Sequence, residues 1–308
     1  MTIQTETHFH SSLTPQEMLA RVRRIQIRAR RLVRLLFLGE YHSVFRGRGL
    51  EFSEVREYQP GDEVRTIDWN VTARMGVPYV KKFVEERELI LYLLVDVSAS
   101  SSFSSTSATK REMAAELATL LAFAADANND KAGVIAFSDR VEFYVEPKRG
   151  TQHVLRMARE LLYHEPLGRG TNIGAAVDLL MRVAKRPAVV FIISDFHTGG
   201  YEGQLRLAGQ KHDITAVSLT DPRELELPRI GLVTLRDPES GAEVLIDTED
   251  RRERERYAGD RAHAALARRR LFASLGVEEI ALRTDRSYIQ PLLAFFKARA
   301  GGKRRSAS

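Results

Sequence analysis

The chain has 308 residues, of which 44% are apolar and 29% are charged, and it contains no cysteine. These values are typical of a globular protein with one large domain and one smaller one, and they exclude disulfide bonds and thiolate metal ligands. The formal net charge of +6 leaves nucleic acid, an anionic membrane surface and an acidic protein open as partners.

Residues 1–13 are predicted to be a disordered tail without the apolar core of a secretory signal. Thr14 followed by Pro15 predicts the start of a helix, with Thr14 as its N-cap, and apolar residues at helical spacing extend it to about Leu38. We interpret it as a helix lying on the protein with a solvated basic face. The alternative is contact with nucleic acid or a membrane through its arginines, which are Arg21, Arg23, Arg24, Arg28, Arg30, Arg31 and Arg34.

Residues 45–88 combine short strand-like runs with turn residues, among them Pro60 and Gly61. A dense mixture of Arg and Asp follows that turn and surrounds Trp69, the only tryptophan. We predict that this mixture forms buried ion pairs around the indole ring. A role in docking a partner is the alternative.

From residue 89 the pattern changes, because apolar strands begin to alternate with amphipathic helices. Such alternation predicts a doubly wound α/β fold with a mostly parallel sheet covered on both faces. The expected strands are Leu89–Val95, Ala132–Phe137, Val141–Val145, Ala188–Ile193, Asp213–Leu219 and Glu278–Leu282. The expected helices are Lys110–Asn128, Gln152–Tyr163, Asn172–Lys185, Gln204–Gln210, Arg251–Leu275 and Tyr288–Ala300.

Gly231–Asp247 is predicted to be a β-hairpin inserted in this domain. We expect it to pack with the strands near Glu51–Tyr58 and Val80–Glu86 as one small β unit. The predicted organisation is therefore an N-terminal helix and small β region over residues 14–88, an α/β domain over 89–300, and a disordered basic tail over 301–308.

The candidate site begins where the first apolar strand ends. Asp96, Ser98 and Ser100 alternate in the loop after that strand. In open α/β sheets, ligands bind beyond the carboxyl ends of the strands, and hard cations such as Mg²⁺ take oxygen ligands. One carboxylate and two hydroxyls leave such a site incomplete.

Two later loops can complete this site. Thr171 follows Gly170 just before a helix, and Asp195 follows the buried strand Ala188–Ile193. We expect oxygens of these residues to converge with those of the first loop around one divalent ion. The alternative is a capped helix start without an ion. His197 lies two residues after Asp195, and it is expected either beside the site or exposed on the surface.

This arrangement resembles the von Willebrand factor A domain and its metal-ion-dependent adhesion site (MIDAS), over roughly residues 88–300. The resemblance implies that Asp96, Ser98, Ser100, Thr171 and Asp195 hold Mg²⁺, with Mn²⁺ or Ca²⁺ as alternatives. It also implies that the sixth coordination position is left for an acidic group of a partner.

The stretch Arg56–Asn70, continued by Ala73 and Arg74, resembles the signature of the domain of unknown function 58 (DUF58) family. The ending Thr284–Tyr288, with Pro291, Leu292, Phe295 and Phe296, resembles the close of the same family. The resemblance implies a partner AAA+ ATPase of the MoxR type, with which the protein acts in assembly or activation of other proteins.

We therefore predict a metal-dependent protein-binding module rather than an enzyme. The chain has no Gly-x-x-x-x-Gly-Lys-Ser/Thr phosphate loop for ATP hydrolysis, and no base stands at a telling position beside Ser98 or Ser100. A metal-dependent hydrolase and a nucleic-acid binder acting through the basic helix are the alternatives. The apolar runs are shorter than the roughly 20 residues of a membrane span, which favours a cytoplasmic location.

Overall fold

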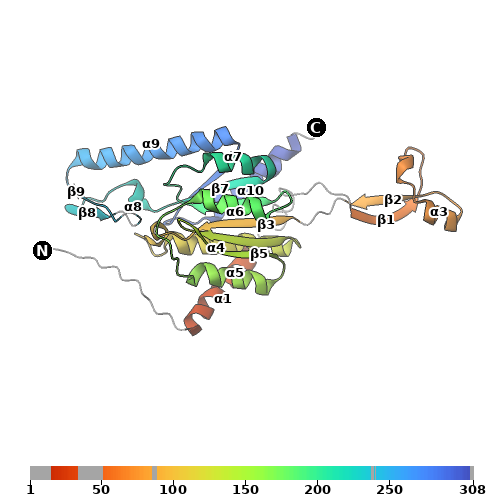
Figure 1. The fold of residues 1–308 in the computed structure, drawn as a ribbon, viewed down its shortest axis with the longest axis horizontal. Helices are drawn as coiled ribbons and strands as arrows, with labels where there is room; N and C mark the ends of the chain where they lie inside the picture. The colour runs from red at the N-terminus through yellow and green to blue at the C-terminus, as the bar shows by residue number, and fades with distance from the viewer. Residues whose placement is uncertain (1–14, 34–50, 85–88, 237–238, 240, 306–308) are drawn as a thin grey trace.

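The computed structural model describes residues 15–33, 51–84, 89–236, 239 and 241–305 (Figure 1). The predicted disordered tail at residues 1–13 and the expected end of the first helix near Leu38 lie outside the described residues. Among the described ones, no helix combines the length and apolarity needed to span a membrane.

A six-stranded sheet forms the centre of the molecule, with strand order β10-β7-β6-β3-β4-β5. All neighbouring pairs are parallel except β4 with β5, so the prediction of a mostly parallel sheet is confirmed. The strand bounds are β3 Ile90–Asp96, β4 Lys131–Phe137, β5 Val141–Lys148, β6 Val189–Ser194, β7 Asp213–Thr220 and β10 Glu278–Arg283.

Helices cover both faces of this sheet, as predicted for a doubly wound fold (Figure 1). Side chains of α1, α4, α5 and α10 pack on one face, whereas side chains of α6, α7 and α9 pack on the other. The bounds are α1 Pro15–Leu32, α4 Lys110–Ala127, α5 Thr151–Tyr163, α6 Ile173–Val183, α7 Glu202–Lys211, α9 Arg251–Leu275 and α10 Ile289–Arg305. Short helices lie at η2 Val64–Thr66, α3 Trp69–Met75, η3 Ala99–Ser102 and α8 Pro222–Leu225.

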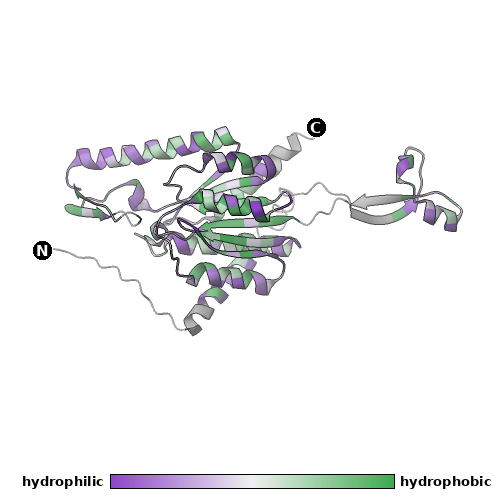
Figure 2. Cartoon of the chain, in the orientation of Figure 1, coloured by the Kyte–Doolittle hydropathy of each residue, from purple (hydrophilic) through white to green (hydrophobic). Residues whose placement is uncertain are grey.

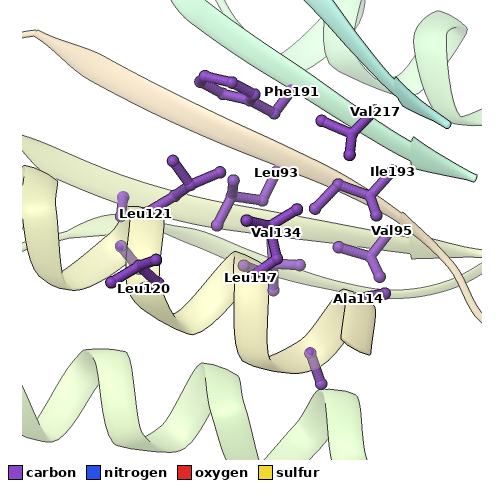
Figure 3. Close-up of a cluster of buried hydrophobic side chains, with 14 of the residues drawn as sticks. Leu93, Val95, Ala114, Leu117, Leu120, Leu121, Val134, Phe191, Ile193 and Val217 are labelled. Atoms are coloured by element: carbon purple, nitrogen blue, oxygen red, sulfur yellow. The ribbon is translucent and has the colours of Figure 1, made fainter. Parts of the chain in front are cut away.

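The two cores follow from the two-residue period of a strand, which sends successive side chains to opposite faces. In β3, Leu93 and Val95 enter one cluster, whereas Tyr92 and Leu94 enter the other. Figure 3 shows the first cluster, in which side chains of α4 meet those of the sheet. The central strands are largely hydrophobic and α9 is largely hydrophilic (Figure 2), as expected for a buried sheet beneath an outer helix.

The basic helix α1 lies on the protein, as we interpreted it from the sequence. Its residues Val22, Ile25 and Ala29 are buried, and the helix packs on α4 and α5. The arginines of the other face include Arg28, whose guanidinium lies 5.8 Å from the centre of the Tyr288 ring.

The expected single small β unit is wrong, because its strands form two separate sheets. Strand β1 (Glu51–Glu57) pairs with β2 (Tyr79–Val84), and β8 (Leu232–Arg236) pairs with β9 (Glu243–Asp247). The hairpin is separate from the central sheet, as expected, and its two strands pair only with each other among the described residues. The C-terminal segment also differs from the prediction, because α10 continues through residues 301–305.

The segment after Pro60 forms the expected turn, and Arg56 pairs with Asp62 at 2.7 Å. The prediction that the tryptophan is buried is wrong, since Trp69 is 66% exposed. The reason is local: the Asp68 carboxylate caps α3 by accepting from the backbone N–H groups of its first turn. Trp69 is the first residue of this helix, and the apolar side chains of Val64, Met75 and Val77 in the same segment are also exposed.

The outer strand β5 carries an irregularity that shapes one edge of the sheet. Its pairing with β4 shifts register between Ala132 and Val134, opposite Pro147. A Cβ at Gly133 would lie 2.8 Å from the Pro147 ring, so only glycine lets the two backbones approach this closely.

The core between α4 and the sheet predicts a large stability loss on truncation. Leu117 on α4 is 0% exposed, so Leu117→Ala leaves a cavity and is expected to lower the free energy of unfolding by about 2–5 kcal/mol. Leu207→Ala removes the same atoms from a side chain that is 60% exposed and should change stability by less than about 0.5 kcal/mol. Urea denaturation of both variants checks this, and equal losses would contradict the packing described.

Candidate metal centre

Buried polar residues follow the carboxyl ends of the parallel strands. They lie directly after β4, β6, β7 and β10 and at the end of β3, and they are Asp96, Ser138, Asp195, Asp221 and Thr284. The chain leaves β3 toward β4 on one side and returns to β6 on the other. The ends of β3 and β6 therefore form a topological switch point, where ligands of such sheets bind.

Asp96 is the central carboxylate of this edge and is 3% exposed. One of its oxygens, Oδ1, accepts from the backbone N–H of Ser98 at 2.9 Å, and Oδ2 accepts from the Ser194 hydroxyl at 2.6 Å. Burial and, to a smaller extent, the nearby negative charge of Asp195 raise the pKa of Asp96 to about 6, although its hydrogen bonds with Ser194 and Ser98 act to lower it. The carboxylate is thus held in a fixed orientation, with its charge incompletely compensated.

The two serines of the first loop are brought together beside Asp96. Their hydroxyl oxygens lie 3.0 Å apart, and Ser101 donates to the Ser98 carbonyl at 2.7 Å. The backbone N–H of Ala99 donates to the Arg169 carbonyl at 3.0 Å. This last bond ties the first loop to the loop that carries Thr171.

Asp195, at the end of β6, forms an ion pair that the sequence did not predict. The ammonium of Lys110 lies 2.7 Å from Asp195 Oδ2 and 2.6 Å from Glu224 Oε1. The lysine side chain is 2% exposed. Burial opposes ionisation of Asp195, but the Lys110 charge outweighs it and lowers the pKa of the aspartate. Asp195 therefore remains ionised next to Asp96.

The turn after Asp195 is strained and tightly held. Phe196 has a φ of 55°, a left-handed conformation that is uncommon for a bulky side chain and often marks a functional site. Its ring packs edge-on against Phe272 and Tyr201, with centroid distances of 5.1 and 6.0 Å. Its backbone N–H donates at 3.1 Å to Ser194, the residue that donates to Asp96.

The loop before Thr171 is fixed by Glu142 on β5. This carboxylate accepts from the backbone N–H groups of Leu167 and Gly168 at 3.0 and 2.8 Å, and also from the Ser138 hydroxyl. Burial opposes ionisation of Glu142, but the hydrogen bonds outweigh it and lower its pKa to about 2. The loop that presents Thr171 is therefore anchored to the sheet.

The Thr171 hydroxyl is engaged by an acidic side chain from a distant segment. It donates to Glu239 Oε1 at 2.6 Å, and Glu239 belongs to the turn between β8 and β9. A Cβ at Gly170 would lie 3.8 Å from the other carboxylate oxygen. The carboxylate of Glu239 therefore lies against both Gly170 and Thr171.

Four of the five predicted ligands lie together, and the fifth, Thr171, is directed elsewhere. Asp96, Ser98 and Ser100 are joined by direct hydrogen bonds, and Asp195 lies close enough to Asp96 to shift its pKa. Thr171 is tied to this group only through the backbone of its loop, and its hydroxyl is directed to Glu239. Convergence of all five around one ion stays a prediction.

A second grouping of possible ligands adjoins the first. Ligand atoms of Asp195, His197 and Glu224 lie within 4.8 Å of one another. His197 was expected either beside the site or exposed on the surface. It is exposed, and it also lies beside the site. Because the Lys110 ammonium contacts both carboxylates, an ion at this grouping would have to displace it.

The chemistry of the donors fits a hard divalent cation on the Asp96 side. The carboxylates of Asp195 and Glu224 share the ammonium of Lys110, and Asp96 lies close enough to Asp195 for that charge to raise its pKa. Carboxylate and hydroxyl oxygens are the ligands that Mg²⁺, Mn²⁺ and Ca²⁺ prefer. A cation there would compensate the charge that raises the pKa of Asp96.

Sequence reasoning missed Lys110, Glu224 and Glu239. Lys110 did leave a signal: it is the first residue of α4, and a cation at a helix N-terminus opposes the helix dipole. A buried carboxylate partner would explain that placement. The two glutamates left no comparable signal, because acidic residues are common in exposed turns and short helices.

Comparison with known proteins places these features in a family. The chain matches the family described as "Protein of unknown function DUF58" over residues 54–266. Uncharacterized proteins of Mycobacterium tuberculosis and Mycobacterium bovis are each 34% identical over 273 residues, covering 86% of this chain and 84% of the relative. A solved structure of the conserved hypothetical protein BatB from Bacteroides thetaiotaomicron is 19% identical and covers 71% of this chain and 98% of its own, with a TM-score of 0.42. The VWA domain of SpRpn10 is 10% identical and covers 68% of this chain and 94% of its own, with a TM-score of 0.37.

The raised pKa of Asp96 predicts that replacing it with the neutral Asn increases the free energy of unfolding, and that the increase depends on pH. In EDTA, between pH about 4 and about 6, Asp96 keeps in the folded protein a proton that it has released in the unfolded chain, so its contribution to wild-type stability falls as the pH rises. Asp96→Asn removes this loss and keeps the acceptor for Ser194. Its advantage over wild type should grow across that window and reach up to about 3 kcal/mol at pH 7.

Urea denaturation at a series of pH values measures this difference. Asp178→Asn, on the exposed face of α6, is the control and should show no such trend. A stability advantage of Asp96→Asn that is absent at pH 7, or equal at pH 4 and pH 7, would contradict the electrostatic description.

Proposed function

The chain belongs to the DUF58 family, and we propose that it is a metal-dependent protein-binding module that grips an acidic group of its partner. The observation that carries the proposal is the buried carboxylate of Asp96, whose charge is incompletely compensated, next to the ionised Asp195 and the paired hydroxyls of Ser98 and Ser100. The α/β fold, with its loops gathered beyond the carboxyl ends of the strands, is suited to presenting such a site.

The proposed ion would be held by the five residues expected from the resemblance to the MIDAS, which are Asp96, Ser98, Ser100, Thr171 and Asp195. Mg²⁺ is the expected ion, with Mn²⁺ or Ca²⁺ as alternatives. When bound, it supplies a positive charge and a coordination position that a carboxylate can take. Because Lys110 already offsets the charge of Asp195, the ion would keep much of its own charge and favour an incoming Asp or Glu.

The proposed partner is an AAA+ ATPase of the MoxR type, acting with this chain in assembly or activation of client proteins in the cytoplasm. This part rests on the family resemblance. A module that binds acidic groups only when loaded with metal would let such an ATPase engage and release a client.

A metal-dependent hydrolase is the enzyme-class alternative, and the geometry gives it less support. Lys110 is the cationic side chain nearest the carboxylates; burial opposes its charge, but Asp195 and Glu224 raise its pKa, so it is unsuited to act as a base. Within the described residues, no hydrogen bond joins Ser98 or Ser100 to a histidine or lysine side chain.

Nucleic-acid binding through α1 is also less favoured. Two of its arginines are paired within the chain: Arg21 with Glu112 and Arg28 with Glu116. Arg30 donates to Thr151 at 2.5 Å. These contacts use charge that phosphate contacts would require.

The first prediction from this proposal concerns the metal alone. Mg²⁺ or Mn²⁺ at about 100 times its dissociation constant should stabilise the fold by about 2.7 kcal/mol. That corresponds to a rise of about 5–10 °C in Tm, measured by calorimetry. Asp96→Ala should abolish the rise, whereas Asp178→Ala should keep it. An equal rise in wild type and Asp96→Ala would place the ion elsewhere.

The second prediction concerns the partner. Immobilised chain incubated with extract of the native cell should capture an AAA+ ATPase or a client in Mg²⁺ and lose it in EDTA. Thr171→Ala should weaken capture without lowering Tm by more than about 2 °C, since it removes one hydrogen bond of a half-buried side chain. Ser274→Ala, which removes a hydroxyl from α9, should capture as wild type does.

Two outcomes would contradict the binding proposal. One is capture that persists in EDTA and in Thr171→Ala. The other is metal-stimulated hydrolysis of ATP, an ester or a phosphodiester by the purified chain that vanishes in Asp96→Ala, which would favour the hydrolase.

A further inference from the structure

The contact between Glu239 and Thr171 joins two segments that the fold has no need to join. The β8–β9 hairpin is its own two-stranded sheet, and its tip supplies a carboxylate to a loop 68 positions earlier in the chain. The hydroxyl that donates belongs to one of the five proposed metal ligands. The group that accepts is a carboxylate, the same chemistry that the site is proposed to take from a partner.

The hairpin is fixed at its base and reaches the site with its tip. The Thr248 hydroxyl donates to the Gly231 carbonyl at 2.6 Å and accepts from the backbone N–H of Ile230 at 3.0 Å. Thr248 is fully buried. The anchoring is therefore at the end far from Glu239, so Glu239 can leave Thr171 while the hairpin stays in place.

The segment that leads into the hairpin touches the same site from its other side. Helix α8 is capped by the buried Asp221 and carries Glu224, which pairs with Lys110 at 2.6 Å. One excursion of the chain thus places Glu224 against the ammonium beside Asp195 and Glu239 against Thr171. This segment of the chain therefore contacts the site at two points.

We propose that Glu239 is an internal competitor, which occupies the partner-binding position at Thr171 and must be displaced when an acidic group of a partner binds. This inference rests on the proposed function. It adds a regulation: the affinity for a partner is reduced by the fraction of molecules in which Glu239 is engaged. If nine tenths are engaged, the apparent affinity for an external carboxylate is lowered by about tenfold.

The test compares the full-length wild type with Glu239→Gln, which keeps the size of the side chain and removes its charge. Glu243→Gln is the matched control, because it removes the same charge from the same hairpin at an exposed position near Arg236. Mn²⁺ serves as the metal probe and acetate as the carboxylate probe. Free Mn²⁺ is counted by electron paramagnetic resonance, and water access to bound Mn²⁺ is followed by proton relaxation.

We expect Glu239→Gln to bind Mn²⁺ with an affinity close to that of wild type. Acetate should displace Mn²⁺-bound water at about tenfold lower concentration than in wild type, and Glu243→Gln should match wild type. In metal-free protein, hydrogen exchange of the backbone amides at residues 169–172 should be faster in Glu239→Gln only, because the contact with Glu239 is weakened.

Three results would overturn the proposal, and each identifies a different fault. Equal acetate dependence in all three proteins means that Glu239 does not compete. A loss of Mn²⁺ affinity of about tenfold or more in Glu239→Gln, with no acetate effect, means that Glu239 is a permanent ligand. No Mn²⁺ binding by any of the proteins means that the proposed function itself fails, and a faster exchange in Glu239→Gln then leaves the contact as a structural tie.

Discussion

The repulsion between two buried carboxylates is the constraint on which the site at the carboxyl ends of the parallel strands depends. Asp96 and Asp195 end adjacent parallel strands, and the sheet leaves them no freedom to separate. Burying like charges is costly unless they are paired and hydrogen-bonded. The chain meets part of that cost with Lys110, brought in by the first turn of α4, and part with Ser194, which donates to Asp96. The remaining imbalance is the physical reason to expect a cation.

The fold was predictable because its signal is repeated along the chain. Each central strand is a short apolar run, each helix has an apolar face, and the alternation of the two admits few topologies. The small elements were less predictable, since their structure depends on single contacts. The Asp68 carboxylate caps α3, and Trp69, the first residue of that helix, is exposed. Periodicity carries no information about such a contact.

The candidate site was predictable to the extent that it is set by strand ends. Asp96 and the serines that follow it are close in sequence, so their proximity follows from one loop. Lys110 and Glu239 enter from a helix start and a hairpin tip, and their contacts depend on how loops of particular length fold back. The left-handed φ of Phe196 likewise gave no signal in the sequence, and its ring contacts two aromatic rings farther along the chain.

The close approach of Pro147 to Gly133 has a consequence for how the protein can associate. An exposed outer strand is a template for adding another strand, from a second copy or from an extended peptide. In β5, the proline lacks the N–H that such a ladder needs, the register shift bends the strand, and Glu146 and Lys148 place charge beside it. Growth of the sheet past β5 is thus disfavoured. At this edge of the sheet, contacts with other chains are left to side chains rather than to backbone pairing.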